Sequence, residues 1–386
     1  MDWILECSAC GRTEAPEGLP TVCSCGLPWL VRYPSRQISP SARDQLRGTG
    51  MWRYRPFLPL VPGEEPVSLG EGGTPLLKLA RTGDAFGLHD LWLKDEATNP
   101  TGSFKARGLA AAVTRAVAAG VRRFVIPTAG NAGVAASAYA ARAGATARVY
   151  APVSTPGPIL TQIRVFGGDL VTLDGHIGDC GKASRAYAAE QGAMDLSTLR
   201  EPYRIEGKKT LGLELVEAFE WQVPDAIIYP TGGGTGLIGM WKVFKELSDA
   251  GWIRGRLPRM YSVQSTGCAP IVSAFEGGHE RAVAWVDPWT IASGLRVPGP
   301  LGDRLILQAL RESGGGAIAV TDDDLAETAA RWSAVEGVDL SPEGGAALAA
   351  ARIARARGWL LPGDRTVAFN TGAGWLYRVA GQLPGR

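Results

Sequence analysis

The sequence predicts an α/β protein with two lobes built on parallel sheets, preceded by a small cysteine-bearing segment. Three observations carry this prediction. Short apolar segments alternate with helix-forming segments along most of the chain, as in parallel sheets covered by helices on both faces. A glycine-rich stretch at residues 232–236 follows one such segment, and such sheets bind ligands at the carboxyl ends of their strands. Four of the six cysteines lie within the first 25 of 386 residues.

The amino-terminal cysteines form two close pairs. Two residues separate Cys7 from Cys10, and one residue separates Cys23 from Cys25. Two such pairs predict a zinc ribbon, because tetrahedral zinc takes four thiolates from two tight turns. The alternatives are a degenerate ribbon without metal and reduced structural thiols. We expect residues 1–30 to form this zinc-ribbon-like segment and residues 31–60 to form an extended arm.

The alternation of helix and strand begins after residue 105. We predict helices over residues 106–119, 132–143 and 179–189 and one ending at Gly167, with strands at residues 124–126, 147–150 and 170–173. The pattern resumes after Ile205, with strands at residues 226–229, 260–263 and 366–369 and two helices before the last strand. Residues 278–300 are rich in Gly, Pro and Trp, so we expect them to be irregular.

Lys105 lies just behind a turn at the start of an alanine-rich helix. Pro100 and Gly102 punctuate the loop, and Thr101 or Ser103 can cap the helix. A lysine at a helix amino terminus faces a partial positive charge that disfavours its ammonium form, and a neutral amine can condense with a carbonyl. The alternative is an ordinary surface lysine.

The glycine-rich loop predicts a phosphate site. Residues 232–236 follow an apolar strand and open a helix, so several N–H groups converge where the helix dipole favours an anion. The spacing fits neither the Walker pattern nor the dinucleotide fingerprint. The alternative is a plain strand-to-helix turn. A lysine suited to imine formation and a phosphate cradle together predict pyridoxal 5′-phosphate (PLP).

Five sequence blocks add a resemblance to this reasoning. KDEATNPTGSFKARG, PTAGNAGVAASAYAARAG, YRIEGKKT, YPTGGGTG and FNTGAG occur in the order found in fold-type II PLP enzymes. Over residues 50–375 the chain most closely resembles threonine synthases and their paralogues, within the tryptophan synthase beta superfamily. The resemblance implies a large PLP-binding lobe (residues 61–104 and 200–386), a small mobile lobe (residues 105–199) and a homodimer. Many threonine synthase-like chains also carry an amino-terminal cysteine segment.

The resemblance implies roles for residues of these blocks. Lys105 would be the Schiff-base lysine and the general base and acid. Asn131 would bond the cofactor 3′-oxygen, although a helix N-cap is its alternative. Thr371 would face the pyridine nitrogen with a hydroxyl, which does not force protonation of the ring. The implied cofactor-binding set is Phe104, Lys105, Asn131, Gly232, Gly233, Gly234, Thr235, Gly236 and Thr371.

The implied substrate site comes from two other blocks. The α-carboxylate would be held by the loop Thr128, Ala129, Gly130, Asn131 and Ala132. Arg204 would contact a substrate phosphate, and Lys208 shares its face if both lie in the first turn of a helix. A solvated basic face is the alternative for Lys208 and Lys209. His176 either faces the side-chain pocket or lies in a loop.

The chain departs from threonine synthases around this substrate site. TLREPYR at residues 198–204 lacks their Asn-Ser pair, Lys208 stands where glutamine is usual, and the loop around His176 differs. The resemblance leads us to expect a lyase that converts O-phospho-L-homoserine and water to L-threonine and phosphate, and these departures motivate the alternative enzymes. The alternatives are a serine/threonine dehydratase-like or cysteate synthase-like enzyme, a non-catalytic PLP-binding paralogue, and an interaction protein that uses the ribbon.

The composition and charge limit the classes of binding partner that we expect. The net charge of +2 gives no reason to expect nucleic acid or membrane partners. The resemblance implies a small, phosphorylated amino-acid substrate. No apolar run is long enough to span a membrane, and the first residues lack a basic region. A cytoplasmic enzyme is the expectation. Cys180 and Cys268 are expected to be buried as small apolar residues.

Overall fold

A computed structural model describes residues 1–34 and 39–378. The chain divides into two compact units. The first comprises Met1–Gly73, Asn99–Leu211 and Ala250–Trp252, and the second comprises Thr74–Thr98, Gly212–Asp249 and the chain from Ile253 onward. Each unit has its own parallel sheet, so the predicted α/β class with parallel sheets is confirmed.

The first unit begins with a small antiparallel sheet. Its strands are β1 (Ile4–Cys7), β2 (Thr13–Glu14) and β3 (Trp29–Arg32), in the order β2-β1-β3. Cys7, at the end of β1, pairs with Trp29 at the start of β3. The arm that follows contains two short 3₁₀ helices, η1 (Pro40–Gln45) and η2 (Met51–Phe57).

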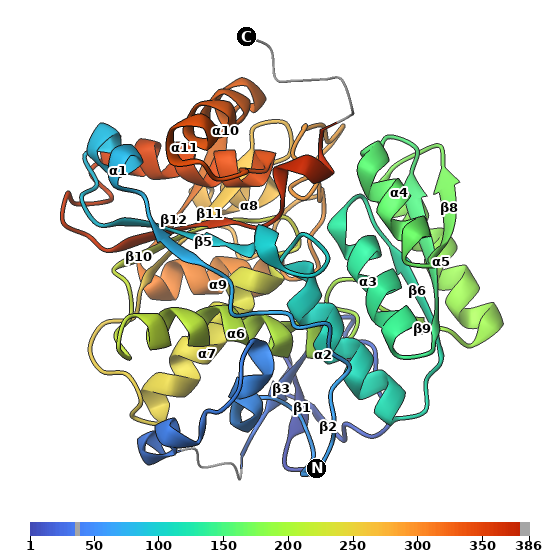
Figure 1. The fold of residues 1–386 in the computed structure, drawn as a ribbon. Coiled ribbons are helices and arrows are strands. Elements are labelled where there is room, and N and C mark those ends of the chain that lie inside the picture. Colours follow the sequence, from blue (N-terminus) through green and yellow to red (C-terminus); the bar gives the residue numbers. More distant parts are fainter. Residues whose placement is uncertain (35–38, 379–386) are drawn as a thin grey trace. The chain divides into compact units, whose positions relative to one another are not determined.

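The larger sheet of the first unit is parallel, in the order β8-β7-β6-β9. Its strands are β6 (Arg123–Pro127), β7 (Thr146–Pro152), β8 (Asp169–Leu173) and β9 (Met194–Asp195). Its helices are α2 (Lys105–Ala118), α3 (Asn131–Arg142), α4 (Gly157–Val165), α5 (Ile177–Gln191) and the start of α6 (Tyr203–Ala218). Neighbouring residues of β7 face opposite helices: Val149 lies against Gly133 of α3, and Tyr150 packs with Cys180 of α5. Helices therefore cover both faces (Figure 1).

The second unit contains a six-stranded sheet in the order β12-β11-β10-β13-β5-β4. Its strands are β4 (Leu76–Lys78), β5 (Leu91–Asp95), β10 (Ala226–Pro230), β11 (Arg259–Ser265), β12 (Gly316–Val320) and β13 (Thr366–Asn370). All neighbours are parallel except β4, which runs antiparallel to β5. The short η3 (Glu96–Thr98) follows β5, and η4 (Gly374–Leu376) follows β13.

Helices of the second unit pack on this sheet. They are α1 (Ala80–Phe86), α7 (Thr235–Asp249), α8 (Pro270–Glu276), α9 (Asp303–Ser313), α10 (Asp322–Glu336) and α11 (Pro342–Ala356). Ala226 and Ile228 of β10 share a buried cluster with the alanines of α11. Tyr229 points to the opposite face, where its ring meets Phe369 edge to face at 5.1 Å. Strands that are apolar on both faces are typical of a buried parallel sheet.

Most predicted elements are confirmed. The irregular segment predicted at residues 278–300 lies between the end of α8 at Glu276 and the start of α9 at Asp303. Strands β5 and β12 were not predicted, because β5 ends in Lys94 and Asp95 and β12 begins with glycine. Cys180 and Cys268 are fully buried, as expected. Within residues 1–34 and 39–378, no helix combines the length and apolar character needed to cross a bilayer.

Candidate active site

Lys105 is the first residue of α2 and follows a buried turn. The Gly102 N–H donates to the Asn99 carbonyl at 2.8 Å, and Gly102 has a φ of +67°, a conformation that glycine adopts without strain. The hydroxyl of Ser103, which is fully buried, accepts the Lys105 N–H at 3.4 Å. The Lys105 Nζ lies 4.4 Å from the centroid of the Phe104 ring. The turn therefore fixes the backbone at Lys105, and the Lys105 amine lies beside the Phe104 ring.

The backbones of α6 and α2 are in contact where the two helices cross, because both helices have a glycine at the crossing. A Cβ on Gly207 would lie 2.1 Å from the Arg107 carbonyl oxygen. A Cβ on Gly108 would lie 3.0 Å from both the Arg204 carbonyl oxygen and the Lys208 Cε. Arg204 and Lys208 therefore share one face of α6, as predicted, and that face lies on α2.

Lys208 and Lys209 are both completely buried, so the interpretation of a solvated basic face is wrong. Lys208 donates a hydrogen bond to the Phe104 carbonyl, and its Nζ lies 4.1 Å from the Phe104 ring centroid. Lys209 forms an ion pair with Glu206 at 2.8 Å, and neither side chain is exposed to solvent. Two neighbouring lysines thus have different partners on different faces of one helix.

Arg204 is 1% exposed, and its guanidinium has nitrogens both with and without a hydrogen-bond partner among the described residues. Its Nη1 donates to the Leu196 carbonyl at 2.7 Å. Its Nε and Nη2 are buried and have no hydrogen-bond partner within the described part of the chain. Burial lowers the pKa of Arg204, and the Glu201 carboxylate opposes that shift. Nε and Nη2 form the fork that binds planar or tetrahedral anions in a bidentate manner.

Glu201 holds the start of α6. Its carboxylate accepts the Tyr203 N–H at 2.8 Å and the Arg204 N–H at 3.1 Å. Burial raises the pKa of Glu201 to about 7, although Arg204 opposes that shift. Sequence reasoning missed Glu201, whose position directly before a helix was the only available signal.

The loop between β6 and α3 is fixed by Thr128. Its hydroxyl accepts the N–H groups of Gly130 and Gly133, each at 3.1 Å, and donates to the Gly130 carbonyl at 2.6 Å. Helix α3 begins at Asn131 with Gly130 as its N-cap, so Asn131 is not the cap that the alternative proposed. His176 is exposed and is the N-cap of α5, where its backbone N–H donates to Asp179 at 3.1 Å. This position favours a loop histidine over one that faces the side-chain pocket.

The glycine-rich loop of the second unit joins β10 to α7. A Cβ on Gly232 would lie 2.2 Å from the Gly294 carbonyl oxygen, and one on Gly236 would lie 1.9 Å from the Tyr229 Oη. Gly234 has a φ of +76°. A side chain at position 232 or 236 would thus clash with these atoms. The first N–H groups of α7, which begins at Thr235, lack partners within the helix and can bind a phosphate.

Thr371 lies at the same edge of the sheet as this loop, because β13 is the parallel neighbour of β10. The preceding residue, Asn370, is fully buried and donates from Nδ2 to Asp95 Oδ1 at 2.9 Å. Its Oδ1 accepts the Ser341 N–H at 3.1 Å. Burial raises the pKa of Asp95. The sequence did not indicate that Asp95 and Ser341 would hold this strand end.

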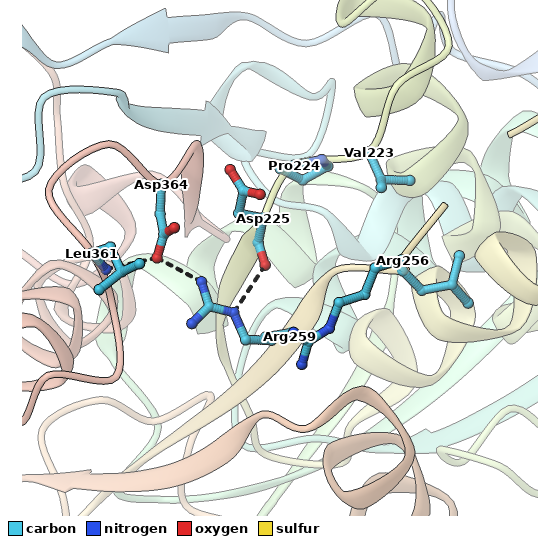
Figure 2. A pocket seen from close by; sticks show the side chains of 8 residues that line it. Val223, Pro224, Asp225, Arg256, Arg259, Leu361 and Asp364 are labelled. Carbon is cyan, nitrogen blue, oxygen red and sulfur yellow. Dashed lines mark hydrogen bonds and ion pairs between the residues drawn. The ribbon is translucent and has the colours of Figure 1, made fainter. Parts of the chain in front are cut away.

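A separate pocket of about 260 Å³ lies at the amino ends of β10 and β11, away from the glycine-rich loop (Figure 2). The Arg259 side chain lines it, forming an ion pair with Asp364 at 2.6 Å and donating to the Asp225 carbonyl at 3.3 Å. The pocket contains none of the predicted site residues. Because Arg259 already forms this ion pair and this hydrogen bond, we assign no role to the pocket.

The four amino-terminal cysteines converge at one point. Their sulfur atoms all lie within 4.8 Å of one another, with Cys7 and Cys25 at 3.4 Å and Cys10 and Cys23 at 3.7 Å. All four are free thiols. Tetrahedral zinc with bonds of about 2.3 Å separates its sulfur ligands by roughly 3.8 Å, so the spacing fits such a site.

Known enzymes match most of this chain in sequence. Residues 67–372 match the family described as pyridoxal-phosphate dependent enzyme. The chain is 32% identical over 378 residues to a threonine synthase of Methanocaldococcus jannaschii, covering 96% of this chain and 92% of the relative. It is 34% identical over 341 residues to a threonine synthase of Mycobacterium tuberculosis, covering 87% and 91%.

Solved structures show the same fold. The processed form of threonine deaminase isoform 2 from Solanum lycopersicum has a TM-score of 0.64 at 21% identity, covering 78% of this chain and 83% of that one. Maize serine racemase has a TM-score of 0.66 at 22% identity, covering 78% and 88%. The lysine at the start of α2 and the glycine-rich loop before α7 lie within the region that matches the family. The chain therefore belongs to the pyridoxal-phosphate dependent enzyme family, as a threonine synthase-like lyase of fold type II.

Proposed function

We propose that the enzyme converts O-phospho-L-homoserine and water to L-threonine and phosphate. One observation carries the choice of a phosphorylated substrate: the buried Nε–Nη2 edge of Arg204. A buried charged donor without a partner is unfavourable, and a phosphate that binds the fork in a bidentate manner satisfies both nitrogens. A substrate without an anionic side chain leaves both unpaired.

The residues of each unit have distinct proposed roles. When bound, PLP supplies an electron sink for chemistry at the amino-acid Cα. The N–H groups of residues 232–236 hold the cofactor phosphate, and Asn131 and Thr371 bond the 3′-oxygen and the pyridine nitrogen. Thr128 shapes the following loop so that residues 129–132 hold the substrate carboxylate. Lys208 acts by holding Phe104, which it already contacts.

Lys105 moves the protons. Its amine removes the Cα proton and then a Cβ proton, and the γ-phosphate leaves with the electrons of its carbon–oxygen bond. Water then adds its hydroxyl group at Cβ, and its other proton goes to the released phosphate. Protons return to Cα and Cγ, which completes L-threonine. The placement of Lys105 at a turn fixed by Ser103 supports this role because proton transfer requires a defined geometry.

A β-eliminating or β-replacing enzyme of the dehydratase or cysteate synthase type is the second candidate. The sequence TLREPYR at residues 198–204 favours it, because this run lacks the Asn-Ser pair of threonine synthases. The two candidates differ in product. Phosphate release from O-phospho-L-homoserine, with threonine formation, supports the first, and keto acid and ammonia from serine or threonine without it would reject the first.

A spectral test addresses the cofactor lysine. We expect the purified enzyme to show the absorbance of a protonated imine and Lys105→Ala to lose both this band and turnover. Lys182→Ala, which changes an exposed lysine of α5, is the matched control and should retain both. A persistent imine band in Lys105→Ala would show that the cofactor is attached elsewhere.

We further propose that Cys7, Cys10, Cys23 and Cys25 bind one structural zinc ion. Their sulfur atoms all lie within 4.8 Å of one another, which places four thiol ligands around one point. We expect one zinc per chain by elemental analysis and its loss in Cys10→Ser. Cys268→Ser, in a buried cysteine outside the cluster, should retain the metal. We also propose a homodimer, which sedimentation analysis tests.

A further inference from the structure

The arm that follows the cysteine segment contacts α6 at Tyr33. Tyr33, one residue past β3, donates a hydrogen bond from its hydroxyl to Glu206 Oε2 at 2.6 Å. The same oxygen pairs with Lys209 Nζ at 2.8 Å. The Lys209 Nζ lies 4.6 Å from the centroid of the Tyr33 ring. Tyr33 therefore contacts both members of an ion pair that has no solvent exposure.

This contact lies on the opposite side of α6 from the candidate substrate residues. At about 100° per residue, Arg204 and Lys208 point one way, and Glu206 and Lys209 point roughly the other way. The first pair faces Gly108 of α2. Helix α6 is thus held between α2 and the arm, so a change at Tyr33 acts on the helix that carries Arg204.

The cysteine segment determines where Tyr33 lies. Strand β3 pairs with β1 from Cys7↔Trp29 to Ile4↔Arg32, and Arg32 also forms an ion pair with Glu6 at 3.0 Å. Cys7, a proposed zinc ligand, pairs with Trp29 at the start of β3, so the cluster anchors one end of this strand and Tyr33 follows the other end.

The same segment also contacts α2. Trp3 is buried, and the Arg115 guanidinium of α2 lies 5.0 Å from its ring centroid. Arg115 is held in turn by Glu64, with contacts of 2.5 Å. The segment thus contacts α2 and the arm that follows it contacts α6, so both bear on the geometry of the crossing at Gly108.

We propose that Tyr33 is a positioning residue through which the metal-bound cysteine segment fixes α6 and orients Arg204 toward the substrate phosphate. This inference rests on the proposed zinc site and the proposed role of Arg204. Tyr33 does not touch the substrate. Its loss, or loss of the metal, weakens binding of the phosphate group and leaves the cofactor in place, because the predicted cofactor-binding residues lie in other segments.

The test compares Tyr33→Phe with Tyr187→Phe, which removes a half-buried tyrosine hydroxyl on α5 of the same unit. We expect Tyr33→Phe to raise KM for O-phospho-L-homoserine roughly three- to tenfold, with kcat changed less than about twofold. The imine absorbance and PLP affinity should not change. Chelation of the metal should raise KM in the wild type and add little in Tyr33→Phe, because both act through one contact.

Amide hydrogen exchange provides a readout that does not depend on the reaction. Peptides covering residues 203–211 should exchange faster in Tyr33→Phe and in metal-depleted wild type, and peptides of α5 should not. Faster exchange without turnover of O-phospho-L-homoserine would support the linkage and reject the proposed substrate. Normal turnover with unchanged exchange in Tyr33→Phe, or additive effects of chelation and mutation, would overturn the linkage.

Discussion

Lys208 donates a hydrogen bond to the Phe104 carbonyl, although the two residues are 104 positions apart. The Lys208 ammonium lies 4.1 Å from the Phe104 ring centroid, and the Lys105 Nζ lies 4.4 Å from the same centroid. A buried cation is thus bonded to the residue directly before the candidate cofactor lysine. Helix α6 therefore holds the start of α2 as well as Arg204.

The contact between Lys208 and Phe104 predicts a difference between two variants. Lys208→Met removes a buried donor and should reduce the free energy of unfolding by about 1–3 kcal/mol. Lys208→Gln keeps a donor and should lose less. Urea denaturation of both variants measures this difference, and equal losses would show that the hydrogen bond contributes nothing.

Arg204 should determine affinity for the substrate phosphate. Arg204→Lys keeps the charge but loses the fork, so we expect KM for O-phospho-L-homoserine to rise by roughly 10- to 100-fold with little change in PLP affinity. Inhibition by inorganic phosphate should weaken in parallel. Arg200→Lys, four residues earlier and outside α6, is the control. An unchanged KM in Arg204→Lys would contradict the assignment of the phosphate site.

The glycine-rich loop should not tolerate a side chain at position 232. A Cβ there would lie 2.2 Å from a backbone oxygen, which cannot move without shifting the Gly294 segment. Gly232→Ala should therefore reduce the free energy of unfolding by about 1–3 kcal/mol and weaken PLP binding. In Gly178→Ala of α5 the Cβ meets nothing within 4 Å, so this control should be neutral or slightly stabilising. Full cofactor occupancy in Gly232→Ala would contradict the steric argument.

Glu201 should make stability depend on pH. Its pKa is raised from 4.5 to about 7 by burial, so the folded state keeps a proton that the unfolded state releases. The stabilising contribution is complete below about pH 4.5 and is lost as pH rises toward 7, by up to about 3 kcal/mol. Urea denaturation at pH 5 and 7.5 should show a smaller decrease in Glu201→Gln. Equal pH dependence in both proteins would show that Glu201 ionises normally.

The sequence by itself determined the local chemistry. The turn before Lys105, the glycine loop before α7 and the alternation of short strands with helices are encoded by neighbouring residues, because turn chemistry and side-chain periodicity act over short distances. The same reasoning placed Arg204 and Lys208 on one face of a helix, since their spacing of four is a property of the helix itself.

Only the tertiary structure decided the partners of these residues. Lys208 and Lys209 are adjacent and chemically identical, yet one bonds Phe104 and the other pairs with Glu206 beneath Tyr33. Tyr33 and Glu206 are 173 positions apart, and no local pattern links them. Burial and long-range pairing depend on how helices and strands pack, which neither composition nor periodicity specifies.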